Sequence, residues 1–482
     1  MNCKLVFHIL GLVLRVEAVL MLPSAAIGFF CGTGDGADIL LSAAITLLMG
    51  QLLTLLPREG AKMQARDGFA AVGLAWIGLS LFGALPYVFS GVIPNYAEAV
   101  FETASGLTTT GATVLTFVEG QPRGILFWRG QTQWMGGVGV LVLALALFPK
   151  LGEGSVYLMR AESPGPIKSK LTPHLRDTAK ILYTIYIGLT AAEVLCLCLA
   201  GMPLYDAVIH AFTTISTGGF SVRDASIGAY NSMAINWIVI IFMFLSGVNF
   251  SLLFAALRRD FQSVWRSEEL RCYTVTTLVA TGLIIVDLVV RAGRLLNMDT
   301  VTDAAFQMVT LMTTTGYMTD DYVLWPTFSQ TVLIIVMLMG GCAGSTAGGI
   351  KHVRVVLLGK SLVRELRRIL HPRQVTTIKC DGERVSEQIL SGIGVFFFAY
   401  ILLLMAGTLV TAWDGVDFIT AFGASLTCLS NVGPGFGTMG PTSNFSALSD
   451  VSTVVLTLNM LLGRLEIMPL LLLAFPGLWK KR

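Results

Sequence analysis

Four short segments bring glycine and hydroxyl-bearing side chains together at matching positions. They are Thr109-Thr110-Gly111, Thr217-Gly218-Gly219, Thr314-Thr315-Gly316 and Asn431-Val432-Gly433. When the segments are aligned on their last glycine, alanine stands twelve residues earlier in each, at Ala99, Ala207, Ala304 and Ala421. A hydroxyl side chain stands three residues earlier in each, at Thr108, Ser216, Thr313 and Ser430. Agreement at several positions indicates one unit that is repeated four times.

The backbone of these segments suits a desolvated monovalent cation. A permeating cation must exchange its hydration shell for protein ligands, and rings of backbone carbonyls do this in potassium channels. Glycine permits the backbone angles that aim carbonyls inward and lets four chains approach closely. We therefore predict a cation filter made by Thr110, Gly111, Gly218, Gly219, Thr315, Gly316, Val432 and Gly433, flanked by Thr109, Thr217, Thr314 and Asn431. The alternative is that the glycines only pack or terminate helices, which four glycines in register disfavour.

A second glycine-rich stretch, residues 340–349, suggests a gate. Five glycines in ten residues oppose a continuous helix, because each costs about 1 kcal/mol relative to alanine. We predict a flexible intramembrane segment on the cytoplasmic side of the filter, to which Gly340, Gly341, Gly344, Ser345, Thr346, Gly348 and Gly349 contribute. Close helix packing through small residues is the alternative.

Two arginines lie within apolar segments. A charge at the centre of a spanning helix costs roughly 2.5–3.5 kcal/mol on insertion scales and marks a functional candidate. Arg464 is predicted to act in the gate, since a cation below the filter opposes potassium unless it is displaced. A structural salt bridge with Glu466 is the alternative. Arg129, which has Gln133 one turn further on, is expected to reach the outer interface by snorkelling.

The composition places the elements that must position these residues in a membrane. Of the 482 residues, 54% are hydrophobic and 13% are charged, whereas soluble domains carry roughly 25% charged residues. About 20 apolar residues make one spanning helix. Such runs precede the four segments, at 70–92, 177–200, 273–290 and 389–412, and follow them, at 125–148, 234–257, 329–358 and 451–475. Two more runs, 4–30 and 38–56, stand before the first unit.

The predicted fold class is an all-α polytopic membrane protein. Four tandem helix–pore loop–helix repeats surround one pore, and two N-terminal transmembrane helices are added to them. Each later run carries a glycine near its middle, at Gly137, Gly247, Gly341 and Gly463. The divisions are 1–66 for the helix pair, 67–160, 161–268 and 269–386 for repeats one to three, with a cytoplasmic basic segment in the third, and 387–482 for repeat four.

A short helix is expected directly before each segment. The stretch from Glu98 to Leu107, at about 15 Å, would cross only half a bilayer. An acid begins the stretch in three repeats, at Glu98, Asp206 and Asp303, and Thr420 takes that place in the fourth. The negative C-terminal end of each helix dipole would then point at the middle of the membrane, where it favours a cation.

The basic residues predict the orientation. Most of the 33 Lys and Arg residues fall in segments that share one side, namely 57–67, 150–180, 257–271, 351–386 and 480–482. By the positive-inside rule this side is cytoplasmic, and ten spanning helices would place both termini there. The basic amphipathic segment 351–386 is expected either to lie on anionic membrane lipid or to bind a cytosolic regulator.

Over essentially its whole length the sequence resembles the TrkH branch of the Trk/Ktr/HKT superfamily of potassium transporters. The motifs that carry the resemblance are Thr109-Thr110-Gly111-Ala112, Thr217-Gly218-Gly219-Phe220, Thr314-Thr315-Gly316-Tyr317 and Asn431-Val432-Gly433-Pro434. The resemblance implies potassium selectivity, because sodium-permeable HKT relatives have serine where Gly111 stands. It also implies an intramembrane gating loop at 340–349, a pore-facing Arg464, a homodimer, a nucleotide-binding regulatory subunit of the TrkA type, and a bacterial inner membrane.

The sequence thus predicts gated potassium uptake through one channel-like pore, with a potassium ion in the pore and no covalently bound cofactor. The rival is a symporter coupled to sodium or protons by alternating access, although such carriers often use inverted repeats. A membrane sensor without transport would leave the four matching segments unexplained. The histidines show no ligand spacing and no phosphate-binding glycine-lysine motif occurs, so neither an enzyme nor a nucleic-acid partner is expected.

Overall fold

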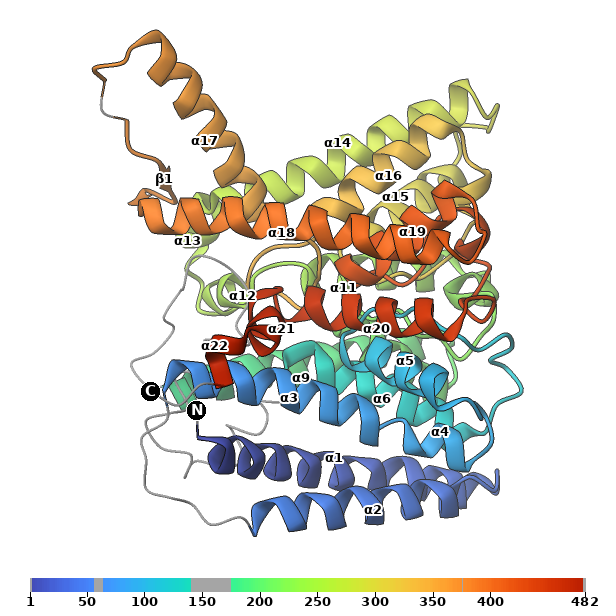
Figure 1. Ribbon diagram of the computed structural model, residues 1–482. Coiled ribbons are helices and arrows are strands. Elements are labelled where there is room, and N and C mark those ends of the chain that lie inside the picture. The colour runs from blue at the N-terminus through green and yellow to red at the C-terminus, as the bar shows by residue number, and fades with distance from the viewer. Residues whose placement is uncertain (1, 56–63, 140–174, 375, 480–482) are drawn as a thin grey trace.

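The computed structural model describes residues 2–55, 64–139, 175–374 and 376–479. These residues form helices that run roughly side by side, so that their ends make two opposite faces of the molecule (Figure 1). The described strands, β1 (Lys379–Cys380) and β2 (Glu383–Arg384), form one small antiparallel hairpin. The helices α1 (Cys3–Cys31) and α22 (Pro476–Trp479) respectively begin and end at the same face.

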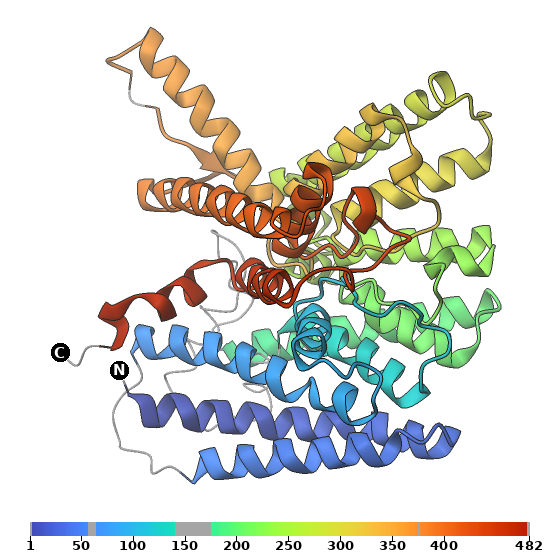
Figure 2. The same cartoon turned by 45° about the vertical axis from the view of Figure 1, so that its right-hand side comes forward.

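The expected N-terminal helix pair is present as α1 and α2 (Gly36–Thr54). The two helices pack closely along their length (Figure 2). A Cβ on Gly11 would lie 2.7 Å from the carbonyl oxygen of Gly50. Glycine at these two positions therefore lets the helix backbones approach, as small residues do between helices in membranes.

The helices that precede the four glycine segments are long, as predicted. They are α3 (Ala65–Phe82) with α4 (Leu85–Phe89), α9 (Leu175–Leu199), α14 (Glu268–Val290) and α18 (Glu387–Ala412). Together with α1 and α2 they supply the six helices, among the described residues, that are long and apolar enough to cross a membrane. The chain is therefore a multi-pass helical membrane protein.

The helices that follow the segments are shorter than the predicted runs. They are α6 (Arg123–Val138), α11 (Met233–Ser246), α16 (Thr327–Met339) and α20 (Asp450–Arg464). New helices continue three of the runs, namely α12 (Phe250–Leu257), α17 (His352–Leu370), and α21 (Met468–Ala474) with α22. The prediction of unbroken spans at 234–257 and 451–475 is thus wrong, and the predicted interruption of the run 329–358 at residues 340–349 is confirmed, while the run 125–148 continues outside the described residues.

The breaks leave fewer helices with the length and hydropathy of a span. If α11 and α12, which are bent by 103°, are taken as one broken span, the described residues contain up to seven such elements, and the expected ten spans stay a prediction because the run 125–148 continues outside those residues. Each break lies within two residues of the repeated glycine. These glycines are closely packed, since a Cβ on Gly463 would lie 2.0 Å from the carbonyl oxygen of Leu429 and one on Gly247 would lie 2.5 Å from the Tyr273 hydroxyl oxygen.

Four short helices lead into the glycine segments, as predicted. They are α5 (Tyr96–Leu107), α10 (Leu204–Ile215), α15 (Met298–Met312) and α19 (Phe418–Ser430). Asn95, Asn297 and Asp417 cap three of them by accepting a hydrogen bond from a backbone amide of the first turn. The acid in the first turn of α15 is Asp299 and not Asp303, because this helix begins earlier than the sequence pattern suggested.

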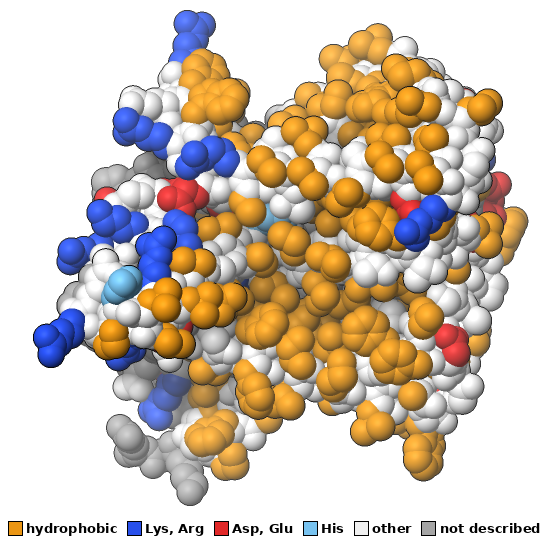
Figure 3. All heavy atoms as spheres, turned by 90° about the horizontal axis from the view of Figure 1, so that it is seen from above, with side chains coloured by type: hydrophobic (Ala, Val, Ile, Leu, Met, Phe, Trp, Pro, Cys, Tyr) orange, Lys and Arg blue, Asp and Glu red, His pale blue; other side chains and the backbone are white. Residues whose placement is uncertain are grey.

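The remaining helical pieces are short and connect the longer elements. They are α13 (Phe261–Arg266) and the 3-10 turns η2 (Ser226–Tyr230), η3 (Tyr322–Leu324) and η4 (Gly437–Met439). Figure 3 shows a broad hydrophobic belt across the middle of the molecule and most of the visible Lys and Arg side chains gathered at one end. That end is the one at which α1 begins, in agreement with the predicted charge asymmetry.

Candidate functional site

The four glycine segments meet in a closed ring. Each glycine lies so near a carbonyl of the next segment along the chain that a Cβ would overlap its oxygen. The distance from the Cβ position of the glycine to the carbonyl oxygen is 2.1 Å for Gly111 and Gly218, 1.9 Å for Gly219 and Thr315, 2.1 Å for Gly316 and Val432, and 2.7 Å for Gly433 and Thr110. The last contact joins the fourth segment to the first. The structure thus brings all eight predicted filter residues together in one cycle.

The backbone of the ring has the same unusual shape in every segment. Positive φ angles occur at the glycines Gly111 (85°), Gly219 (76°), Gly316 (82°) and Gly433 (107°). They occur again two residues earlier, at Thr109 (55°), Thr217 (56°), Thr314 (58°) and Asn431 (58°). Non-glycine residues seldom adopt such angles, and strain of this kind persists only where the surroundings enforce it. Four similar exceptions at matching positions therefore make this backbone the candidate functional element.

The amides of the ring are bonded back to the short helices. In each segment the residue before the glycine donates its N–H to a carbonyl five residues earlier. The pairs are Thr110 and Ser105 (2.8 Å), Gly218 and Thr213 (2.7 Å), Thr315 and Thr310 (2.8 Å), and Val432 and Thr427 (3.0 Å). Because these bonds occupy the N–H groups and satisfy carbonyls at the helix ends, they fix each segment in place.

Side chains beside the ring stabilise it through hydrogen bonds. The hydroxyls of Thr108 and Thr110 lie 2.7 Å apart, and those of Thr313 and Thr315 lie 2.8 Å apart. Asn431 donates its side-chain amide to the Thr110 hydroxyl (3.0 Å) and to the carbonyl of Met460 (2.9 Å). The Asn431 side chain thus links the fourth segment to the first and to helix α20.

The prediction for Arg129 is wrong. The side chain does not reach the interface but is buried, with 3% of its surface exposed, and pairs with the fully buried Glu102 at 2.6 Å. Its guanidinium also donates to the carbonyl of Ser221 (3.0 Å) and lies over the Phe220 ring, 3.5 Å from the centroid. Glu102 accepts from the backbone amide of Val114 (3.0 Å). The pair therefore ties together the chains that leave the first and second segments.

The sequence prediction also missed the role of Gln133, which lies one turn after Arg129 in α6. Its side chain donates to the carbonyl of Gly218 (2.6 Å) and accepts from the amide of Phe220 (3.0 Å). Two polar residues one turn apart in an apolar helix were the available signal. The spacing puts them on one face, but the sequence did not indicate which segment that face meets.

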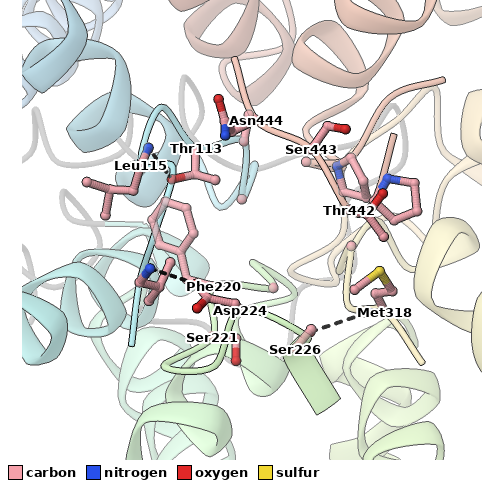
Figure 4. Close-up of a pocket in the computed structure, with 18 of the residues that line it drawn as sticks. Thr113, Leu115, Phe220, Ser221, Asp224, Ser226, Met318, Thr442, Ser443 and Asn444 are labelled. Atoms are coloured by element: carbon pink, nitrogen blue, oxygen red, sulfur yellow. Dashed lines mark hydrogen bonds between the residues drawn. The ribbon is translucent and has the colours of Figure 1, made fainter. Parts of the chain in front are cut away.

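A cavity of about 150 Å³ opens beside the ring, at the face opposite the ends of the chain. Its lining combines the four ring glycines Gly111, Gly219, Gly316 and Gly433 with the chains that follow them. Figure 4 shows lining residues such as Thr113, Phe220, Met318 and Asn444 arranged around the opening from four separate parts of the chain. The backbone ring is therefore open to this side through a polar mouth.

The opposite side of the ring is covered by the stretch 340–351, which is not helical. Positive φ angles at Gly340, Gly344 and Gly349 account for three of its glycines. The amide of Gly348 donates to the Thr314 hydroxyl (2.7 Å), and the amide of Gly349 donates to the carbonyl of Ser430 (2.9 Å). This stretch therefore lies directly against the third and fourth ring segments.

Two further residues of this stretch bind the second repeat. The Thr346 hydroxyl donates to the carbonyls of Ile215 (3.1 Å) and Ser246 (3.2 Å), at the ends of α10 and α11. The carbonyl of Gly344 accepts from the amide of Phe250 (3.0 Å). Ser345 donates its hydroxyl to the carbonyl of Cys342 (2.6 Å), within the stretch itself. The alternative of small residues that only pack two helices is wrong, because the stretch is a buried, hydrogen-bonded loop.

Arg464 completes the contacts below the ring. Its guanidinium donates to the carbonyls of Gly136 (2.5 Å) and Gly137 (2.7 Å) at the end of α6, and to that of Thr346 (2.8 Å). It also approaches the hydroxyl of Thr109, 3.3 Å away. Glu466 pairs with Arg354 at 2.5 Å and not with Arg464, so the alternative of an Arg464–Glu466 salt bridge is wrong.

The predicted basic segment begins with α17, which continues directly from the loop. The first turn of this helix is buried and its remainder projects from the body (Figures 1 and 2). Arg354 joins the helix to Glu466 and stacks over Phe396, 4.0 Å from the ring centroid. The basic stretch 150–180 falls almost entirely outside the described residues.

The described residues contain no group of three or more His, Cys, Asp or Glu side chains that could hold a metal ion. The ligands that the ring offers are backbone carbonyls, which are hard oxygen donors of low charge. Such donors suit a monovalent cation better than a transition metal, which prefers imidazole or thiolate ligands.

Comparison with known proteins agrees with this geometry. Residues 36–481 match the TrkH family, described as cation transport proteins. The chain is 39% identical to the Trk system potassium uptake protein TrkH of Salmonella typhimurium over 100% of both chains. It is 35% identical to TrkG of Escherichia coli K12 over 99% of both. Its fold matches the crystal structure of the potassium transporter TrkH from Vibrio parahaemolyticus with a TM-score of 0.88 and 36% identity, covering 100% of both chains.

Proposed function

Because the chain belongs to the TrkH family of cation transport proteins, we propose that it takes up potassium across the cytoplasmic membrane of a bacterium through one channel-like pore. The family also bears out the expectation that the protein is not an enzyme. The observation that carries the proposal is the closed ring of four glycine segments. Such a ring requires four equivalent segments of the chain at the same depth in the membrane. Non-helical backbone at that depth is tolerated only where it is buried in protein or lines water.

In this proposal the carbonyls of the ring replace the hydration shell of potassium. The amides are bonded back to the short helices, so the carbonyls are available to an ion. The C-terminal ends of α5, α10, α15 and α19 all lie next to the ring, and the negative ends of their dipoles favour a cation there. The divisions 67–160, 161–268, 269–386 and 387–482 would then be four repeats of one pore unit.

The loop 340–349 and Arg464 would close this pore. The loop lies against the second, third and fourth ring segments or their helices, and Arg464 joins it to the end of α6. Opening would require these bonds to break. The structure that follows the loop, α17, carries the basic residues that would face the cytoplasm, with both ends of the chain on that side. A homodimer, a TrkA-type regulatory subunit and anionic lipid are the partners we propose.

The test is potassium and sodium flux into proteoliposomes that hold the purified protein alone, under an imposed gradient. We expect fast potassium-selective flux that does not depend on a sodium or proton gradient. Slow flux that follows the gradient of a second ion would replace the channel with a symporter.

Gly111→Ser tests the ring itself. The new side chain would start 2.1 Å from the carbonyl oxygen of Gly218 and displace it, so the potassium-to-sodium ratio should fall and sodium should enter. Gly188→Ser is the control, because Gly188 has nothing within 4 Å of its Cβ position. An unchanged ratio in Gly111→Ser would contradict the place of Gly111 in the filter.

A further inference from the structure

The second ring segment is held differently from the other three. In the first and third segments the residue before the glycine is threonine, and its hydroxyl pairs with that of a neighbouring threonine. In the fourth segment that residue is Val432, beside the Asn431 side chain that bonds Met460 and Thr110. In the second segment the residue is Gly218, which has no side chain and so cannot make an equivalent side-chain hydrogen bond.

Gln133 occupies the place of the missing side chain. The three atoms nearest to a Cβ on Gly218 would all belong to Gln133, namely Cδ at 2.3 Å, Oε1 at 2.5 Å and Nε2 at 2.7 Å. The Gln133 side chain is fully buried. It reaches the segment from α6, in the preceding repeat. The absence of a side chain at position 218 is therefore required by the presence of Gln133.

The amide that follows the ring glycine also has a different anchor in this segment. In the third segment the amide of Tyr317 donates to the hydroxyl of Thr310 in its own short helix (2.8 Å). In the second segment the matching hydroxyl, that of Thr213, instead bonds the Tyr317 hydroxyl. The amide of Phe220 donates to Gln133 Oε1 in its place (3.0 Å).

We propose that Gln133 is a positioning residue that determines ion selectivity at the second filter segment. Its side chain holds the carbonyl of Gly218 and the amide of Phe220, which lie on either side of Gly219, at a fixed separation. The 2.6 Å bond from Nε2 also draws on the electron density of the Gly218 carbonyl, so this carbonyl is a weaker cation ligand than those of Thr110, Thr315 and Val432. The inference rests on the proposed function of the ring as a potassium filter.

The first test is the potassium-to-sodium flux ratio of Gln133→Ala in proteoliposomes. Loss of two buried hydrogen bonds should let the Gly218 carbonyl move, and the ratio should fall by about tenfold. The ratio does not depend on how many molecules are folded, so a loss of folded protein alone would leave it unchanged. Gln133→Met, which fills more of the space without the amide, should show the same fall and serves if the alanine variant does not fold.

Gln131→Ala is the matched control. Gln131 is a buried glutamine of the same helix, but its side chain accepts a hydrogen bond from Ser24 in α1 (2.9 Å), away from the ring. This variant should keep the wild-type ratio. If Gln131→Ala and Gln133→Ala lower the ratio equally, the effect belongs to α6 in general and the proposal is wrong.

An exchange of anchors gives the sharper test. Gly218→Thr alone should lose selectivity, because its Cβ would start 2.3 Å from Gln133 Cδ. Combined with Gln133→Ala, the same change should restore much of the ratio. The new hydroxyl could then pair with that of Ser216, as the hydroxyls of Thr110 and Thr108 do. A double variant no better than the two single variants would overturn the inference.

The outcome is distinguishable from failure of the proposed function. If the wild-type protein is not potassium-selective, or if Gly111→Ser leaves its ratio unchanged, the filter itself is wrong whatever Gln133 does. If the wild type is selective and Gly111→Ser admits sodium, while Gln133→Ala and Gln133→Met keep the wild-type ratio, only the role of Gln133 is refuted.

Discussion

The glycine ring and the loop 340–351 are both rich in glycine and both interrupt helices inside the membrane, but their hydrogen bonds lead to different places. Each ring segment bonds its amides to the short helix directly before it, five residues away. The loop sends many of its bonds to other repeats, to Ile215 and Ser246 in the second and to Ser430 and Arg464 in the fourth.

In the proposed pore this difference would separate a fixed filter from a gate that moves. Local bonds within one helix–loop unit persist when the units shift relative to one another, so each segment keeps its own shape. Bonds between units break together when the units shift, and elements that move in regulation are drawn from such less stable regions. In the ring, glycine lets the backbones of neighbouring segments approach closely. In the loop, glycine lets the backbone leave the helical conformation.

The largest effect is expected for Gly219→Ala, which adds a side chain inside the ring. The new Cβ would start 1.9 Å from the carbonyl oxygen of Thr315, at a φ of 76°. Strain of about 1–3 kcal/mol and the displaced carbonyl should lower potassium uptake by tenfold or more. Gly188→Ala, on an exposed part of α9, is the control in the same proteoliposome assay. Near-normal uptake by Gly219→Ala would show that the ring is not part of the path.

A smaller effect of opposite sign is expected for Arg464→Gln, which removes the arginine that joins the loop to the end of α6. The variant loses a charge that donates to Gly136, Gly137 and Thr346. Since hydrogen bonds to a charged group contribute about 1.5–3 kcal/mol, basal flux without a regulator should rise about tenfold. The exposed Arg367→Gln in α17 is the matched control. If the variant folds less well and shows no gain in flux, Arg464 has a structural role only.

The smallest effect is expected for Gly348→Ala within the loop. Its Cβ would start 2.1 Å from the carbonyl oxygen of Ser430, so the loop must retreat from the fourth short helix. Basal potassium flux should rise by a few-fold, with the potassium-to-sodium ratio unchanged because the ring is untouched. Gly282→Ala, which has nothing within 4 Å of its Cβ position, should change neither quantity. A changed ratio would show that ring and loop are one mechanical unit.

The local features of this protein follow from its sequence. The four short helices, the positive φ angles at Gly111, Gly219, Gly316 and Gly433, and the break after Met339 each depend on residues close together in the chain. The effects of helix caps, of glycine and of the spacing of apolar residues on the backbone extend over one or two helical turns. Four copies of one pattern made those signals stronger than any single copy could.

The partners of the charged and amide side chains did not follow from the sequence. Arg129 was expected at the interface but pairs with Glu102, and Arg464, for which Glu466 was the alternative partner, joins α6 to the loop. Such side chains must be paired wherever they are buried, and the sequence supplies several candidates for each.

The sequence by itself therefore determined a multi-pass helical membrane protein, its repeated glycine segments and the residues that line their ring. The tertiary structure decided where the later helices break, which carbonyls receive Arg464, and that Gln133 of one repeat holds Gly218 of the next, 85 positions along the chain. The reason is that periodicity and turn chemistry report on neighbours in the chain. Contacts between repeats depend on how the finished helices pack.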